Sequence, residues 1–215
     1  MRTFIRLKNR PVGRLPDALH PHDVRYADDL VATFLQEYTK PGDLVFDPFA
    51  GFGTTLIVAE ALGRRASGIE FDLARVEYIR TRLREKAAII HGDSRELARY
   101  PLPAADFLMT SPPFMARGDA EDPLQSYGAP GEGYDAYLAG MERIAAQLPG
   151  ILKPGARAVF EVSNLKQPEG VTTLAWDIAQ LVARHLAFEG EVVIGWDRYG
   201  YGYDHSYCTV FRRER

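Results

Sequence analysis

Three acidic residues stand at or near the ends of three short apolar segments in the first half of the chain. Asp47 ends DLVFD, Glu70 lies in RASGIEFD, and Asp93 ends AAIIHGD. If these segments are parallel strands, the acids meet at one edge of a sheet, where open α/β folds bind nucleotide-like ligands. Asp47 suits a cationic group, Glu70 can accept hydrogen bonds from ribose hydroxyls, and Asp93 can accept one from an adenine amino group. A ribose, an adenine and a cation together describe S-adenosylmethionine, whereas each acid taken alone can equally cap a helix or a turn.

A glycine-rich turn, DPFAGFGTTL at 47–56, begins with the first of these acids. Gly51 and Gly53 allow a tight turn and a close approach of backbone to ligand, and Thr54 or Thr55 can cap the helix that follows. A dinucleotide-binding turn would carry a third glycine where Leu56 stands. The residues that we predict to bind the cofactor on these grounds are Asp47, Pro48, Phe49, Gly51, Gly53, Thr54, Glu70, Phe71 and Asp93.

A second chemical signal, Ser111-Pro112-Pro113-Phe114, follows the apolar run AADFLM. An exocyclic amine on a nucleobase is a poor nucleophile because its lone pair is delocalised into the ring, so its N–H groups need acceptors. The Ser111 hydroxyl and the Pro112 carbonyl can supply them on a backbone that the prolines stiffen, and Phe114 offers a face for the base to stack on. A rigid turn between strand and loop is the alternative interpretation of these four residues.

The pattern of apolar residues predicts the elements that must position these groups. Strands are expected at 43–47, 65–72, 87–93, 104–111, 156–164, 191–196 and 206–213, and helices at 54–63, 73–86, 134–152 and 171–188. Alternation of this kind predicts one α/β domain, 1–215, with a seven-stranded, mostly parallel sheet, helices on both faces and an antiparallel last strand. The fourth strand should neighbour the first, which places 111–114 beside the cofactor. The polar stretch at 115–133 is expected to be a substrate loop.

Composition limits the class of protein. A chain of 215 residues with 46% hydrophobic content can build one core, and the single cysteine, Cys208, provides no disulfide framework. No stretch approaches the roughly 20 apolar residues of a membrane span, so we expect a cytoplasmic protein without a membrane partner. The net charge of -3 provides no general attraction for nucleic acid. The basic extension at 1–18 is either a solvated tail or a phosphate-binding arm.

Two stretches, DPFAGFGTTLIVAEALGRRASGIEFD and TSPPF, resemble the cofactor-binding segment and the catalytic tetrapeptide of the DNA amino-methyltransferases. The serine form is typical of their cytosine-N4 enzymes, and the adenine-N6 enzymes more often carry Asp or Asn in the place of Ser111. A third stretch, LHPHDVRYADDLVATFLQEYTKPGDLVFDPF, resembles the part that closes over the methionine end of the cofactor. His20-Pro21 fits that pattern, but Arg25-Tyr26-Ala27 replaces the expected Lys-Pro or Phe-Pro.

The resemblance implies a single-domain Rossmann-like methyltransferase that uses S-adenosylmethionine and counts His20 among its cofactor-binding residues. The implied reaction is methylation of an exocyclic nucleobase amine, with cytosine N4 in DNA favoured over adenine N6 in DNA or an amine in RNA. A small-molecule or protein amide methyltransferase and a non-catalytic cofactor-binding subunit are the further alternatives.

We expect no separate target-recognition region of the kind these DNA enzymes usually carry, because the predicted catalytic core takes up almost the whole sequence. Sequence choice would then come from the 115–133 loop, the termini, or a homodimer or partner subunit. The tyrosines of WDRYGYGYDHSY, 196–207, can stack on bases or cover a sheet edge or dimer interface. The histidines show no metal-ligand spacing, so no metal is expected, and Cys208 is interpreted as a core residue.

Overall fold

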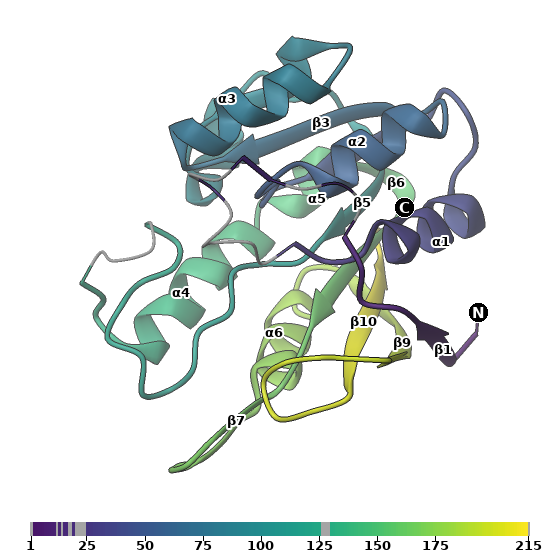
Figure 1. The fold of residues 1–215 in the computed structure, drawn as a ribbon. Coiled ribbons are helices and arrows are strands. Elements are labelled where there is room, and N and C mark those ends of the chain that lie inside the picture. The colour runs from purple at the N-terminus through teal and green to yellow at the C-terminus, as the bar shows by residue number, and fades with distance from the viewer. Residues whose placement is uncertain are drawn as a thin grey trace.

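The computed structural model describes residues 2–11, 13, 15, 16, 19, 25–125 and 130–214. One large sheet forms the centre of the molecule (Figure 1). Its strands are β1 (Phe4–Leu7), β2 (Leu44–Asp47), β3 (Arg65–Glu70), β4 (Ile89–His91), β5 (Ala105–Thr110), β6 (Leu152–Val162), β9 (Ala187–Trp196) and β10 (His205–Arg212). Their order across the sheet is β1-β9-β10-β6-β5-β2-β3-β4. The described residues therefore form the predicted α/β architecture.

The sheet is mostly parallel, and β10 runs antiparallel to both of its neighbours, β6 and β9, as predicted for the last strand. It contains eight strands among the described residues, whereas seven were predicted. The additional strand is β1, which pairs in parallel with β9 inside the segment expected to be a basic extension. Arg6 within the strand and Arg2 and Lys8 beside it make the segment resemble a basic tail in the sequence, while Ile5 and Leu7 pack against the core.

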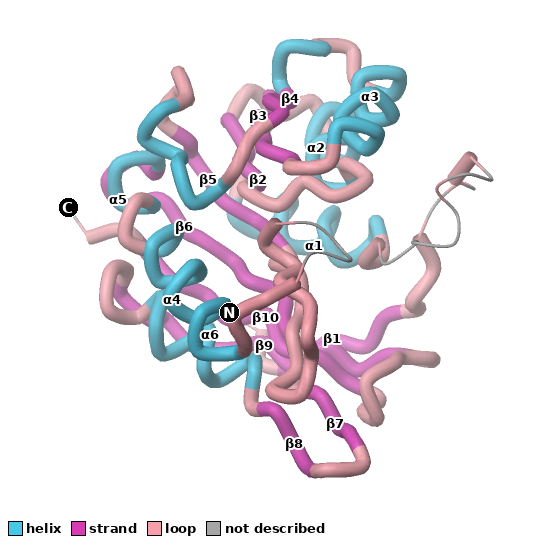
Figure 2. Tube along the Cα trace, turned by 90° about the vertical axis from the view of Figure 1, so that its left-hand side faces the viewer, coloured by secondary structure: helices cyan, strands magenta, loops and turns pink. Residues whose placement is uncertain are grey.

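Helices cover both faces of the sheet (Figure 2). On one face, apolar side chains of β2, β5, β9 and β10 pack with α1 (Asp28–Tyr38) and α2 (Thr54–Ala61), and α2 also packs with α3 (Leu73–Arg82). On the other face, β2, β5 and β6 pack with α4 (Tyr134–Ala145), α5 (Leu148–Ile151) and α6 (Leu174–Val182). Among the described residues the smaller elements are the 3₁₀ turns η2 (Lys86–Ala88) and η3 (Ser94–Arg99) and a two-stranded hairpin, β7 (Leu165–Gln167) with β8 (Gly170–Thr172).

Some boundaries differ from the sequence prediction. The helix expected at 134–152 divides into α4 and α5, and β6 begins at Leu152, where the helix was expected to end. The pairing of β5 with β6 shifts register between Ala105 and Phe107, which accommodates the irregular start of β6. Helix α1 was not predicted as an element, although Leu30, Val31, Phe34 and Leu35 form its buried stripe.

The strand order brings the glycine-rich turn and the Ser-Pro-Pro-Phe segment to one edge of the sheet. Strand β5 pairs with β2 as predicted, and the strand order reverses between these two strands. A crevice at the carboxyl ends of the strands is expected at such a reversal. In the part of the chain that the structure describes, no helix is long and apolar enough to cross a lipid bilayer.

Candidate active site

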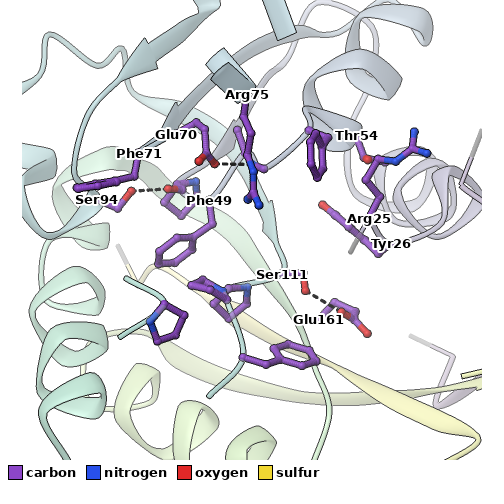
Figure 3. Close-up of a pocket in the computed structure, with 18 of the residues that line it drawn as sticks. Arg25, Tyr26, Phe49, Thr54, Glu70, Phe71, Arg75, Ser94, Ser111 and Glu161 are labelled. Carbon is purple, nitrogen blue, oxygen red and sulfur yellow. Dashed lines mark hydrogen bonds between the residues drawn. The ribbon is translucent and has the colours of Figure 1, made fainter. Parts of the chain in front are cut away.

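A cavity of about 500 Å³ opens at the carboxyl ends of β2–β6 (Figure 3). This volume lies within the range of ordinary small-molecule sites. The predicted residues that line it are Pro48, Phe49, Gly51, Thr54, Glu70, Phe71, Asp93, Ser111, Pro112, Pro113 and Phe114. The structure thus brings the glycine-rich turn and the Ser-Pro-Pro-Phe segment to one cavity. Asp47 and Gly53 lie behind its surface.

The glycine-rich turn depends on two backbone conformations that favour glycine. Gly51 has φ +55°, and Gly53 has φ +83° and is the residue directly before helix α2. A Cβ atom on Gly53 would lie 2.9 Å from the Ile79 side chain on α3, so the turn also packs too closely for any side chain there. The predicted capping by Thr54 or Thr55 is wrong, because no described side chain caps α2. The Thr55 hydroxyl is instead hydrogen-bonded to Tyr26.

Glu70 connects β3 to the turn. Its Oε2 atom accepts a hydrogen bond from the Gly51 N–H at 2.8 Å, and Oε1 accepts one from the Asp72 N–H at 2.9 Å. The side chain is largely buried yet lines the cavity, and this burial raises its pKa. A carboxylate has about four acceptor positions, so two backbone donors orient Glu70 and leave acceptor capacity for a ligand hydroxyl.

Asp47 lies beneath the same turn. Its side chain is 1% exposed, and Oδ1 accepts hydrogen bonds from the Phe49 N–H at 2.9 Å and the Thr110 hydroxyl at 2.6 Å. Burial raises the pKa of Asp47 to about 6. These contacts tie the end of β2 to the end of β5. Asp47 therefore supports the turn from below and does not line the cavity itself.

Asp93 follows β4 and lines the cavity, but its carboxylate is paired with Arg95. Arg95 donates from Nε to both Asp93 oxygens at 3.0 Å and from a terminal nitrogen to Oδ2 at 2.6 Å. The Asp93 Oδ1 atom also accepts from the Arg95 N–H at 2.8 Å at the start of η3. The capping role considered for this acid is therefore present, and any adenine contact would share the carboxylate with Arg95.

Ser111 is hydrogen-bonded to a buried carboxylate that the sequence analysis did not identify. Its Oγ atom donates to Glu161 Oε2 at 2.9 Å (Figure 3). The Tyr199 hydroxyl donates to Glu161 Oε1 at 3.2 Å. Glu161, on β6, is 3% exposed, and burial raises its pKa. With its proton directed to Glu161, the Ser111 oxygen can present lone pairs to an N–H donor in the cavity.

Aromatic side chains surround this pair. The Phe114 ring lies 5.2 Å from the Tyr201 ring at an angle of 57°, and Tyr201 lies 5.8 Å from Tyr199. Tyr199 in turn stacks on Trp196 at 5.8 Å. Tyr201 has φ 62°, the one positive φ outside glycine in the described part of the chain. Two of the tyrosines that could have covered a sheet edge, Tyr199 and Tyr201, thus line the cavity.

Residues before β2 close the opposite side of the cavity. Arg25 and Tyr26, which replace the expected family residues, both line it, and burial raises the pKa of the Tyr26 hydroxyl. His20, predicted to bind the cofactor, lies outside the described residues. The site residues that the sequence did not reveal are Glu161, Tyr26 and Arg95. Glu161 lies in the middle of the apolar run AVFEV, and a single acid in a buried strand was the available signal.

Part of the chain is similar in sequence to known DNA methyltransferases. Residues 6–81 match the model of the N6/N4 methylases, described as DNA methylase. The chain is 38% identical over 88 residues to DNA adenine methyltransferase YhdJ of Escherichia coli and 41% identical over 64 residues to Type II methyltransferase M.HinfI of Haemophilus influenzae. The matched segment is similar to the DNA amino-methyltransferases. The two matches cover 41% and 30% of this chain but 29% and 18% of those proteins.

Solved structures with the same fold include S-adenosylmethionine-dependent methyltransferases. TrmN from Thermus thermophilus superimposes with a TM-score of 0.61 at 19% identity, over 86% of this chain and 48% of that protein. A TehB-like SAM-dependent methyltransferase from Corynebacterium glutamicum gives 0.57 at 14% identity, over 90% of this chain and 91% of that protein. These likenesses confirm the Rossmann-like methyltransferase fold.

The cofactor of this family and fold is S-adenosylmethionine, and the donor set of the cavity fits it. Glu70 is oriented to accept hydrogen bonds, as ribose hydroxyls require, and Phe71 beside it is 42% exposed and offers an apolar face. The side-chain-free backbone at Gly51 permits close approach. Buried acids near the turn suit the positive charge of the sulfonium group.

Proposed function

We propose that this protein transfers a methyl group from S-adenosylmethionine to an exocyclic amine of a nucleobase, with cytosine N4 in DNA as the favoured target. The observation that carries the proposal is the hydrogen bond from Ser111 to the buried carboxylate of Glu161, at the cavity that also contains the glycine-rich turn. When bound, the cofactor supplies an electrophilic methyl group.

The residues of this chain would prepare the amine for that methyl group. The Ser111 oxygen accepts one amine N–H because its own proton is directed to Glu161. The Pro112 carbonyl is the proposed second acceptor, since the neighbouring Pro113 carbonyl already accepts a hydrogen bond from the Tyr137 hydroxyl at 2.8 Å. Two acceptors favour the tetrahedral amine nitrogen, whose lone pair is available to the incoming methyl group.

Glu161 also provides a place for the proton that the amine loses. One proton passes from the amine nitrogen to the Ser111 oxygen as the Ser111 proton passes to Glu161. Burial raises the pKa of Glu161, so the protonated form is less unfavourable there than in water. Glu161 therefore places a carboxylate beside position 111, where the serine side chain itself has none.

Phe114 would hold the base by stacking, with Tyr201 at an angle beside it as a second wall. Adenine N6 in DNA is the second candidate, and the match to an E. coli DNA adenine methyltransferase favours it. The Ser111–Glu161 pair is compatible with either amine, because both present N–H donors. An amine in RNA would use the same groups.

The test is to incubate the protein with isotope-labelled S-adenosylmethionine and, separately, duplex DNA, single-stranded DNA and RNA. Mass spectrometry of the digested nucleosides then identifies the product. N4-methylcytosine in DNA that is lost in Ser111→Ala supports the favoured target, and N6-methyladenine would transfer the assignment to the second candidate. If the cofactor binds and no nucleoside is modified, the proposal of a nucleobase substrate is wrong.

A further inference from the structure

The 115–133 loop, predicted to contact substrate, packs against the cofactor cavity through a short segment. Pro123 and Leu124 line the cavity together with Asp93, Ser94 and Arg95 at the end of β4. Leu124 is 7% exposed and belongs to the hydrophobic core on the α4 face of the sheet. Part of this loop is therefore a fixed wall of the site.

Leu124 fits a notch on helix α4. Gly140 lies within α4, and a Cβ atom built on it would be 2.6 Å from the Leu124 Cδ1 atom. Glycine inside a helix is less favourable than alanine, so its presence calls for a packing reason. The close approach of Leu124 supplies that reason. The loop and α4 run beside each other in Figure 1.

Polar contacts hold the same segment. Asp122 Oδ1 accepts a hydrogen bond from the Leu124 N–H at 2.9 Å, and Asp122 Oδ2 lies 4.0 Å from a terminal nitrogen of Arg95. The Arg95 side chain also donates hydrogen bonds to both carboxylate oxygens of Asp93. The two arms of the loop meet where the Gly131 N–H donates to the Ala120 carbonyl at 2.8 Å. Arg95 thus connects the loop to the end of β4.

We infer that Leu124 is a positioning residue for the cofactor: seated against Gly140, it holds the Pro123-Leu124 segment as the wall of the cavity at its adenine end. This inference rests on the proposed function, because it takes S-adenosylmethionine as the ligand and places its adenine beside Asp93, the residue predicted to accept a hydrogen bond from the adenine amino group. It follows that Gly140, which does not line the cavity, controls cofactor affinity through Leu124.

The test compares two alanine substitutions of helical glycines. Gly140→Ala should expel Leu124, whereas Gly150→Ala in α5 is the control, because a Cβ atom there meets nothing within 4 Å. Isothermal titration calorimetry with S-adenosylmethionine and with adenosine measures binding. We expect Gly140→Ala to weaken both ligands by at least about fivefold, the effect of losing one or two buried methylene contacts, and Gly150→Ala to change neither.

A double variant separates this role from general damage to the fold. Leu124→Ala removes the wall and should weaken both ligands, and Gly140→Ala added to Leu124→Ala should cause no further loss, because the two changes act through one contact. Melting temperatures report folding independently of binding. If Gly140→Ala does not fold, Leu124→Ala alone decides.

The outcomes are distinct. A wild-type protein that binds neither S-adenosylmethionine nor adenosine overturns the proposed function. A wild-type protein that binds both, with affinities unchanged in Gly140→Ala or in Leu124→Ala, overturns the inference and leaves the proposed function intact. Additive losses in the double variant would also overturn it, since they would show two independent effects.

Discussion

Replacing Asp47 with asparagine should make the stability of this protein less sensitive to a rise in pH. The Asp47 carboxyl is 1% exposed, and burial raises its pKa from 3.8 to about 6. Asparagine retains an oxygen that can accept the hydrogen bonds of the Phe49 N–H and the Thr110 hydroxyl. It has no charge to bury, so the variant isolates the cost of ionising this carboxyl.

The sign follows from proton binding in the two states. Below pH 3.8 the carboxyl is protonated whether the chain is folded or unfolded, and ionisation costs nothing. Between pH 3.8 and about 6 the unfolded chain has released this proton while the folded protein retains it, so the free energy of unfolding falls as pH rises. A pKa difference of this size corresponds to about 3 kcal/mol, of which roughly 2 kcal/mol falls between pH 4.5 and 7.5.

Urea unfolding of Asp47→Asn and the wild type at pH 4.5 and 7.5 measures this quantity. The difference in unfolding free energy should move by roughly 2 kcal/mol in favour of the variant as pH rises. Any constant cost of burying the amide cancels in this comparison. Asp106→Asn is the control: despite partial burial, the Leu44 N–H and Lys153 lower the pKa of Asp106, so its stabilising contribution is lost only as pH falls below 3.8. The difference between Asp106→Asn and the wild type should therefore change little between pH 4.5 and 7.5. A pH-independent difference for Asp47→Asn would refute the reasoning.

Three further predictions concern the site. Glu161→Gln should lower the single-turnover rate of methyl transfer by roughly 10- to 100-fold, because Ser111 loses its charged partner. The wild-type rate should fall as pH drops through the raised pKa of Glu161, and the variant should lose that pH dependence. An unchanged rate and pH profile would contradict the assignment. Gly53→Ala should lower the unfolding free energy by about 1–3 kcal/mol in urea titrations, with a smaller loss for Gly42→Ala, which shares a positive φ in open space; equal losses would argue against the packing contribution. Tyr201→Ala should raise KM for the nucleic acid and leave cofactor affinity unchanged, whereas Tyr201→Phe should behave as the wild type; a change in cofactor affinity instead would place Tyr201 elsewhere in the site.

Local sequence predicted the repeating part of the fold well. Strand β2, the glycine-rich turn and helix α2 are contiguous, and their apolar spacing and turn residues act over a few positions. The neighbour relation between β5 and β2 followed from the general topology of such sheets. Strand β1 was missed because four residues paired with a distant strand, β9, carry no local signal that distinguishes them from an extended basic tail.

In the candidate site, too, local motifs predicted some residues, whereas the partners of others depend on the folded structure. Glu70 and Ser111 were predicted because each stands beside a recognisable motif, and both line the cavity. Asp47 was predicted to face the cofactor, but its hydrogen bond to Thr110, 63 positions away, places it under the turn. Asp93 is paired with Arg95, a contact that depends on the turn of η3. The spacing of residues in the sequence indicates which side chains can contribute to the site, but it does not show which partners those side chains bind.

The sequence by itself determined the class of fold, the glycine-rich turn and the residue types offered to a cofactor and an amine. These follow from backbone preferences and from side-chain chemistry, which each residue carries with it. Tertiary structure alone decided that Glu161 lies against Ser111 across 50 positions, and that Leu124 fits the notch at Gly140. Such contacts arise because strand pairing and close packing bring together residues whose separation along the chain contains no information about their distance in space.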